Sequence, residues 1–142
     1  MLGFRAVGDD YGLGGIERVV GEVGSRLAAR GHEVTLFTRT RYSPPAHVEH
    51  EGMTIRRTGA IYTKSLESPS NALFAALRAA RGFDVVHVHA TLPALFSWIP
   101  RLGGTRTVVT VHGLDWRRAK WGAIMRRWQK AGAWAAARLP DA

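Results

Sequence analysis

The chain has 142 residues, of which 46% are hydrophobic, and this length and composition suit one domain with its own packed core. Cysteine is absent, which excludes disulfides, thiol nucleophiles and thiolate metal sites, and no apolar run approaches the roughly 20 residues that a membrane-spanning helix needs. The net charge of +9 makes phosphorylated small molecules, nucleic acid and anionic lipid the candidate partners. The absence of a signal-peptide pattern predicts a cytoplasmic location.

A glycine-rich turn follows the first short apolar segment. Residues 1–7 should form a strand, but the segment is short and contains Gly3, so the strand looks clipped. Residues 11–18 then read YGLGGIER, in which Gly14 and Gly15 would allow positive φ and bring the N–H groups of the next helix against an anion. Because Glu17 stands where G-x-G-x-x-G has its third glycine, a plain tight turn and a phosphate site both remain open.

The rest of the chain alternates between helix and strand patterns. Strands are predicted over 33–38, 53–57, 84–89 and 107–112, with a proline-containing loop over 39–51. Helices are predicted over 16–30, from 68–71 to Gly82, over 94–99 up to Pro100, and from near Ala119 to 137. This order predicts an α/β fold with a Rossmann-like, doubly wound parallel sheet and ligand sites at the carboxyl ends of its strands.

The carboxyl ends of two predicted strands carry histidines. His89 ends one strand, and the sequence HGLD from His112 to Asp115 ends the next. At the crevice of such a sheet an imidazole can donate a hydrogen bond to a sugar or phosphate or move a proton. His112 is therefore the candidate catalytic residue, although a structural histidine bonded to local backbone is the plainer alternative. The candidate substrate-binding residues are Glu17, His89, Gly113 and Asp115.

Several other chemistries are disfavoured by the sequence. His87 and His89 have a spacing that metal ligands sometimes show, but no carboxylate cluster completes a coordination shell, so no metal is expected. No serine occupies a G-x-S-x-G elbow, which argues against a Ser/His/Asp hydrolase.

The last predicted helix is basic and rich in tryptophan. It places Trp121, Ile124, Met125, Trp128 and Ala135 on one face, with Arg126, Arg127 and Lys130 largely on the other. Such a helix either packs on the sheet or anchors the protein at a membrane surface, and the two roles are compatible. Nucleic acid is not expected as a partner, because the aromatic residues follow the apolar stripe.

Four segments resemble, in order, the N-terminal, acceptor-side half of family-4 retaining glycosyltransferases, which have the two-domain GT-B fold. The segments are YGLGGIERV at 11–19, LAARGHEVT at 27–35, DVVHVH at 84–89 and TVHGLDWRRAKW at 110–121. This resemblance implies transfer of a hexose from a nucleotide-sugar to a polysaccharide or glycolipid acceptor with retention, without a metal or other cofactor. It also implies that Gly14 and Gly15 approach the donor diphosphate and that His112 contacts the transferred sugar.

The resemblance has two departures. The family usually has one residue fewer in the glycine turn, so Leu13 resembles an insertion. The second domain of such enzymes, which binds the nucleotide, is not represented, so residues 1–142 are expected to be a single incomplete domain, truncated at both ends and inactive alone. The alternative hypothesis is a non-catalytic binding or peripheral membrane module that uses the C-terminal helix, at the inner face of the plasma membrane.

Overall fold

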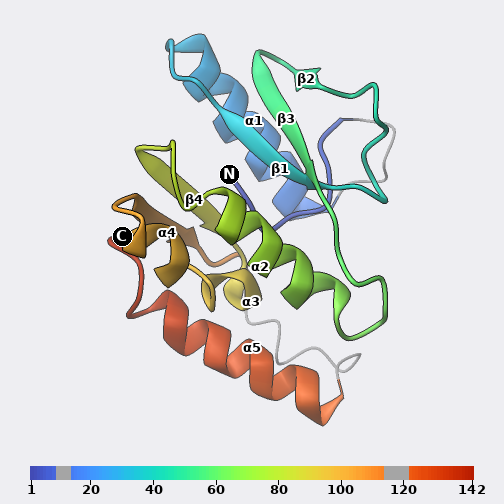
Figure 1. Cartoon of the computed structure of the whole chain (residues 1–142), viewed down its shortest axis with the longest axis vertical. Helices are drawn as coiled ribbons and strands as arrows, with labels where there is room; N and C mark the ends of the chain where they lie inside the picture. The colour runs from blue at the N-terminus through green and yellow to red at the C-terminus, as the bar shows by residue number, and fades with distance from the viewer. Residues whose placement is uncertain (9–13, 114–121) are drawn as a thin grey trace.

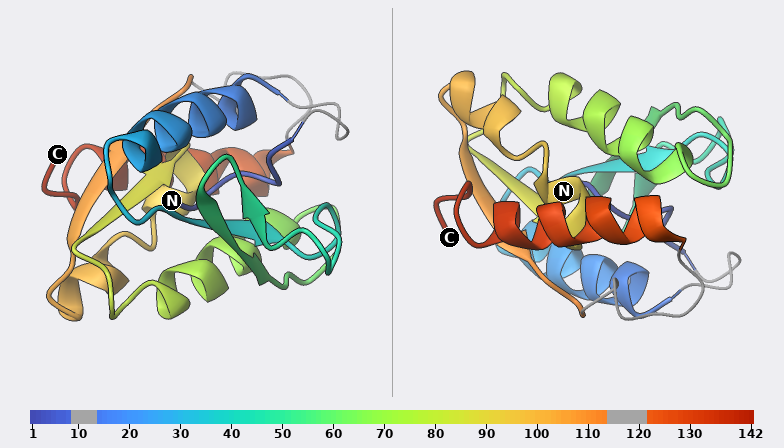
Figure 2. Two further views of the ribbon diagram at one scale, coloured as in Figure 1. Left: turned by 90° about the horizontal axis from the view of Figure 1, so that it is seen from above. Right: turned by 90° about the horizontal axis from the view of Figure 1, so that it is seen from below.

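The structure is a computed structural model that describes residues 1–8, 14–113 and 122–142. Its elements are α1 (Gly15–Ala29), β1 (Thr35–Arg39), β2 (Glu49–His50), β3 (Met53–Thr58), α2 (Glu67–Arg78), β4 (Val85–His89), α3 (Thr91–Ala94), α4 (Trp98–Leu102), β5 (Arg106–Thr110) and α5 (Ala123–Ala136). The helices α1 and α2 cover opposite faces of the strands (Figures 1 and 2). The predicted α/β, Rossmann-like fold is therefore confirmed.

The opening segment of the chain joins two sets of strands into one sheet. β1 pairs in parallel with β3, and β4 pairs in parallel with β5. Leu2 lies against β4, where its N–H donates to the His87 carbonyl at 3.0 Å and its carbonyl accepts from His89 at 2.9 Å. On its other side the segment bonds to β1, because the N–H of Phe37 donates to the Met1 carbonyl at 2.9 Å. The order across the sheet is thus β2, β3, β1, the opening segment, β4 and β5.

Gly3 explains why this central segment is irregular. Its φ is +102°, and a Cβ at this position would collide with the backbone carbonyl oxygen of His89. Only glycine fits there, because both the backbone conformation and the close approach exclude a side chain. The sequence segment therefore does not read as a regular strand, although Leu2 and Phe4 are fully buried.

Two apolar layers hold the helices on the sheet. One layer joins α1 to β1 and β3 through Phe4, Val20, Leu36 and Met53. The other joins α2 to β4, with Ala75 and Ala79 packed near Phe37, Val86 and Val88. Apolar burial on both faces of the strands is what a doubly wound sheet requires.

The structure corrects two element predictions. β2 lies in the segment predicted as a loop, where Glu49 and His50 pair antiparallel with β3. The single helix predicted over 94–99 and ended by Pro100 is wrong, because the chain forms two short helices, α3 and α4, on either side of residues 95–97, and Pro100 is the third residue of α4. The first four N–H groups of a helix have no partner within the helix, so proline loses nothing by lacking one there.

The face of α5 that packs on the molecule also differs from the prediction. The buried residues of α5 are Met125, Gln129, Gly132 and Ala135. Ile124 and Trp128, predicted on the buried face, are exposed, and Trp121 lies outside the described residues. Gln129 is buried because its Oε1 accepts a hydrogen bond from Thr91 Oγ1 at 2.7 Å, a pairing that a search for apolar periodicity does not detect.

The end of the chain lies on the outer edge of β5. The N–H of Asp141 donates to the Thr107 carbonyl at 2.8 Å, and the N–H of Val109 donates to the Ala142 carbonyl at 2.9 Å. A carboxylate oxygen of Asp141 also accepts from the Thr107 N–H at 2.8 Å, which lowers the pKa of Asp141. The last two residues therefore extend the hydrogen bonding of the sheet beyond β5.

Candidate functional site

The carboxyl edge of the sheet brings several of the predicted site residues into one region. His89 is the last residue of β4, His112 follows the end of β5, and Gly14 is the N-cap of α1. The opening segment lies between them, since Phe4 packs against the His89 ring and the N–H of Arg5 bonds to Glu17 at the start of α1. In doubly wound sheets this edge is where ligands bind.

Two hydrogen bonds join the side chains of β4 to those of β5. The Nδ1 atom of His89 lies 3.0 Å from Nε2 of His112, and Nε2 of His87 lies 2.7 Å from Oγ1 of Thr110. Because His87 is in register with Val108 and His89 with Thr110, each bond reaches a residue two positions further along the chain than the partner in register, and His112 lies just beyond the end of β5. His112 is half-buried whereas His89 has no exposed surface, so His112 is the member of the pair that a ligand can reach.

The histidines of β4 are held in the neutral form. Burial lowers the pKa of His89 to about 3, and the neighbouring charges of His87, His112 and the Met1 amino group act in the same direction. Burial also lowers the pKa of His87, again with help from the Met1 amino group and His112. His89 therefore contributes a hydrogen bond rather than a charge at neutral pH.

The start of α1 is open but does not have the backbone conformation predicted for it. Gly14 is extended, with φ −77° and ψ 177°, and Gly15 is the first helical residue, so the prediction of positive φ at these glycines was wrong. Positive φ occurs instead at Gly3 and Gly8. Among the described residues, no side chain caps α1 and no atom lies within 4 Å of a Cβ placed at Gly15. The first N–H groups of α1 have no partner within the helix, and such N–H groups can bind an anion.

Glu17 has a structural contact that the sequence did not reveal. Its side chain is buried, and Oε1 accepts a hydrogen bond from the backbone N–H of Arg5 at 3.3 Å. A Cβ at Gly14 would lie 3.0 Å from Oε2 of the same carboxylate. Glu17 therefore ties the helix start to the opening segment, in addition to complementing the helix dipole.

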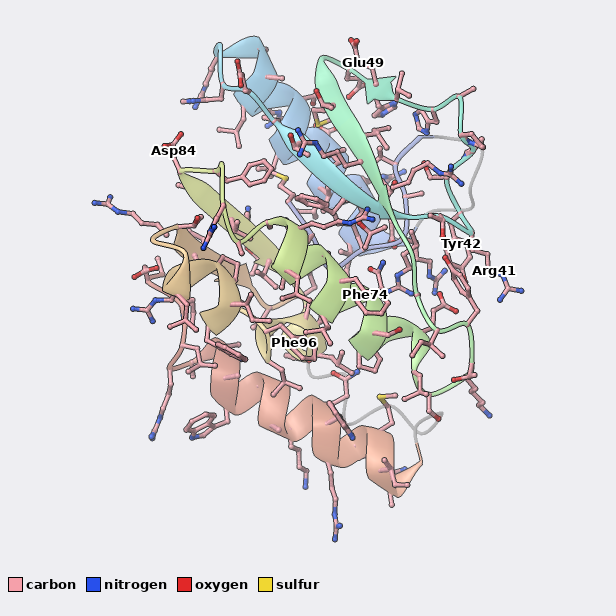
Figure 3. All side chains as sticks on the ribbon, in the orientation of Figure 1. Arg41, Tyr42, Glu49, Phe74, Asp84 and Phe96 are labelled. Atoms are coloured by element: carbon pink, nitrogen blue, oxygen red, sulfur yellow. The ribbon has the colours of Figure 1, made fainter. Side chains whose placement is uncertain are left out.

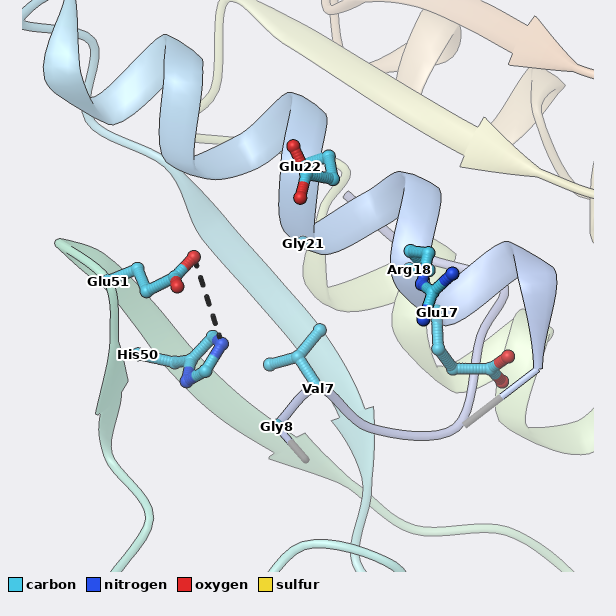
Figure 4. Close-up of a pocket in the computed structure, with 8 residues that line it drawn as sticks. All are labelled: Val7, Gly8, Glu17, Arg18, Gly21, Glu22, His50 and Glu51. Atoms are coloured by element: carbon cyan, nitrogen blue, oxygen red, sulfur yellow. Dashed lines mark ion pairs between the residues drawn. The ribbon is translucent and has the colours of Figure 1, made fainter. Parts of the chain in front are cut away.

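A groove runs beside α1 toward the β2–β3 hairpin, with a volume of about 550 Å³ (Figure 4). On the hairpin, across from the helix, Nε2 of His50 lies 4.0 Å from Oε2 of Glu51, and this contact is an ion pair when His50 is protonated. Glu17, whose carboxylate accepts a hydrogen bond from the backbone N–H of Arg5, lines the end of the groove at the start of α1. The remaining lining residues are Val7, Gly8, Arg18, Gly21 and Glu22. No sequence signal could have found this groove, because its walls come from three separate segments.

The other predicted site residues are less informative. Gly113 is exposed, and a Cβ there would meet no atom of the described residues within 4 Å. Asp115 lies outside the described residues. Within residues 1–8, 14–113 and 122–142, no three His, Asp or Glu side chains are arranged to hold a metal ion.

The outer side of α5 combines cations with exposed apolar side chains. Ile124, Trp128 and Trp134 are 73%, 44% and 56% exposed. Arg126, Arg127 and Lys130 are exposed on the same helix, and Figure 3 shows long nitrogen-tipped side chains pointing from α5 away from the rest of the molecule. In the described part of the chain no helix has the length and apolarity needed to cross a bilayer.

The sequence matches the model of a known protein family. Residues 13–141 match the family model described as Glycosyltransferase Family 4. The match spans both candidate glycines, both histidines of the His89–His112 pair and the whole of α5. No curated protein matches the sequence.

Proposed function

Because the chain belongs to glycosyltransferase family 4, we propose that it acts in the transfer of a hexose from a nucleotide-sugar to a polysaccharide or glycolipid acceptor, with retention at the anomeric carbon. The observation that carries this proposal is the common location of the α1 start and the His89–His112 pair at the carboxyl edge of one sheet. That edge offers hydrogen-bond donors and open space to a phosphorylated sugar.

Each candidate residue has a proposed role at this edge. The N–H groups at Gly15 and the residues after it face the donor diphosphate, where the partial positive charge of the helix start favours an anion. His112 hydrogen-bonds a hydroxyl of the transferred hexose, and Gly113 leaves space beside it. The groove beside α1, which begins at Glu17, lies next to the same edge and is proposed as part of the acceptor site.

The proposed architecture is the N-terminal, acceptor-side half of a GT-B enzyme. In the transition state, negative charge develops on the departing diphosphate, and stabilising it requires donors on both sides of an enclosed cleft. The α1 start supplies one side of that cleft. We therefore expect residues 1–142 to be inactive without a nucleotide-binding domain opposite this edge. No metal or other cofactor is part of the proposal.

The test supplies such a domain in trans and measures hydrolysis of UDP-, GDP- and ADP-linked hexoses. Changing His112→Ala should lower the rate about tenfold or more, because one hydrogen bond in the transition state is worth about 1.4 kcal/mol. His32→Ala is the matched control, since His32 is exposed and follows the other end of α1. An unchanged rate in the His112 variant, with the control also unchanged, would remove His112 from this role.

A second proposal concerns where the enzyme works. We propose that the outer side of α5 rests on an anionic membrane surface, which would place the protein at the inner face of the plasma membrane. The supporting observation is that Trp128 and Trp134 are exposed on a helix with no acidic residue. This contact accompanies the transferase role and brings the carboxyl edge near a lipid-linked acceptor.

A further inference from the structure

The hydrogen bond between His89 and His112 joins two ring nitrogens, so its direction depends on the tautomers of the two rings. We propose that His89 is a positioning residue, whose Nδ1–H donates to Nε2 of His112 and so holds His112 in the tautomer with its proton on Nδ1. The bond is 3.0 Å long, and the two ring planes lie within 24° of each other with centroids 5.3 Å apart. The rings therefore meet edge to edge, as an in-plane N–H···N hydrogen bond requires.

The direction of the bond follows from the protonation state. A neutral imidazole has one N–H donor and one acceptor nitrogen, so one ring of the pair must donate and the other must accept. His89 is neutral because burial lowers its pKa. The proton on His89 is thus on either Nδ1, within the bond to His112, or Nε2, on the far side of the ring.

The far side of the His89 ring decides between these two tautomers. Nε2 of His89 is fully buried and has no hydrogen-bond partner among the described residues. Phe4, which packs edge-to-face on this ring, has no lone pair and can accept only a weak N–H···π contact. A buried N–H without an acceptor is rarer in folded proteins than a buried acceptor without a donor. Placing the proton on Nδ1 leaves only an unfilled lone pair at Nε2.

The surroundings of His89 keep its ring in place for this bond. Its backbone N–H donates to the Leu2 carbonyl on one side, and on the other side the N–H of the next residue, Ala90, donates to the Thr110 carbonyl of β5. Its ring lies between Phe4 and His87, whose ring centroid is 4.1 Å away. The carbonyl of His89 is also covered closely by Gly3. His89 therefore presents Nδ1 to His112 from a rigid position.

This tautomer sets what His112 can offer to a ligand. With Nε2 occupied by the bond from His89, the ring donor left on His112 is Nδ1–H. If the carboxyl edge binds a donor sugar, which is the part of this inference that rests on the proposed function, His112 meets the sugar as a donor to a hydroxyl oxygen. It does not act as a base through Nε2. His89 thereby determines the chemistry of its neighbour without touching the substrate.

Long-range ¹H–¹⁵N NMR correlations of the histidine rings test the tautomer directly in the ¹⁵N-labelled chain. Spectra are recorded at about pH 8, above the ordinary histidine pKa of about 6.5, and the His112 signals are assigned by their loss in His112→Gln. In the wild type the Nδ1–H tautomer of His112 should dominate by about tenfold, which corresponds to about 1.4 kcal/mol. A wild-type spectrum with His112 protonated on Nε2 overturns the inference without any further variant.

Two substitutions separate positioning from mere packing. His89→Asn places an amide N–H close to where Nδ1 lies and should keep the tautomer of His112, whereas His89→Leu should release it toward the Nε2–H form that a free histidine prefers. His32→Asn is the control and should change nothing at His112. Retention of the Nδ1–H form in a folded His89→Leu chain would contradict the proposal. None of these spectra needs a donor sugar, so the tautomer of His112 can be measured even if the chain has no part in sugar transfer. Equally, a wrong tautomer would not by itself contradict the proposed function.

Discussion

Gly132 of α5 lies directly against the backbone carbonyl of Thr91 in α3. A Cβ at Gly132 would collide with this carbonyl oxygen, and one turn away the Thr91 hydroxyl donates to Gln129. The close approach of the two helices and the buried hydrogen bond together fix the rotation of α5. They also determine that Trp128 and Trp134 are exposed rather than buried.

The first prediction concerns this contact. Gly132→Ala should lower the free energy of unfolding by up to about 2 kcal/mol, because the steric cost of overpacking, typically about 1–3 kcal/mol, is offset by a gain of only about 1 kcal/mol in helix propensity. Gly21→Ala in α1 is the matched control, since a Cβ there meets nothing within 4 Å and should stabilise the chain slightly. Urea denaturation of both variants measures the difference, and equal stabilisation of both would contradict the contact.

The second prediction concerns the carboxylate of Glu17. Glu17→Ala should destabilise the fold by about 1–2 kcal/mol, because the N–H of Arg5 loses its buried acceptor. Glu17→Gln keeps an acceptor oxygen and should cost less, about 0.3–1 kcal/mol for the charge lost at the helix start. Glu22→Ala is the control, because Glu22 is exposed and its ion pair with Arg26 contributes little. Equal effects of Glu17→Ala and Glu22→Ala on the urea midpoint would show that the Arg5 contact carries no stability.

The third prediction is a pH dependence of stability that originates at His89. Its pKa is lowered from 6.5 to about 3 in the folded chain, so between these values the unfolded state binds more protons than the folded state. Stability therefore rises with pH in this window and is lost as the pH falls. We expect a loss of about 2 kcal/mol between pH 7.5 and 5 from this group, measured by urea denaturation at each pH.

His89→Asn supplies the control for this pH dependence. The asparagine does not titrate, so the slope of the free energy of unfolding against pH should become shallower. The substitution should change this free energy less at pH 7.5 than it changes the loss between pH 7.5 and 5. His87 contributes in the same direction, because burial lowers its pKa too, and its contribution remains in the variant. An identical slope in the wild type and in His89→Asn would show that His89 is not held neutral by the fold.

Sequence periodicity predicted most elements: α1 buries Val20 and Gly24 at helical spacing, and β4 buries Val86 and Val88 at strand spacing. It failed where a contact with a distant segment decides the structure. The central segment is irregular because the carbonyl of His89 lies against Gly3. The rotation of α5 is fixed because the carbonyl of Thr91 lies against Gly132. Neither contact leaves a local pattern in the sequence.

The candidate site was predictable to a similar extent. Strand ends in a parallel sheet lie at one edge, so the approach of His89 and His112 to that edge followed from the order of elements. The hydrogen bond between their rings did not follow, because it depends on the register of β4 against β5. The roles of Gly14, Gly15 and His112 in a reaction remain predictions.

The fourth prediction tests the proposed membrane contact of α5. The chain should bind vesicles that contain phosphatidylserine and should bind pure phosphatidylcholine vesicles much more weakly, because the cations of α5 attract anionic headgroups by about 1 kcal/mol each. Trp134→Ala should weaken binding severalfold, since Trp134 is exposed beside the guanidinium of Arg138, which lies 5.5 Å from its ring centroid. Phe74→Ala is the control, because Phe74 is an exposed aromatic residue on α2 (Figure 3). Raising the salt concentration should reduce binding of the wild type, as expected for exposed charges. Equal losses of vesicle binding in Trp134→Ala and Phe74→Ala, or equal binding to anionic and neutral vesicles, would exclude α5 as the membrane contact.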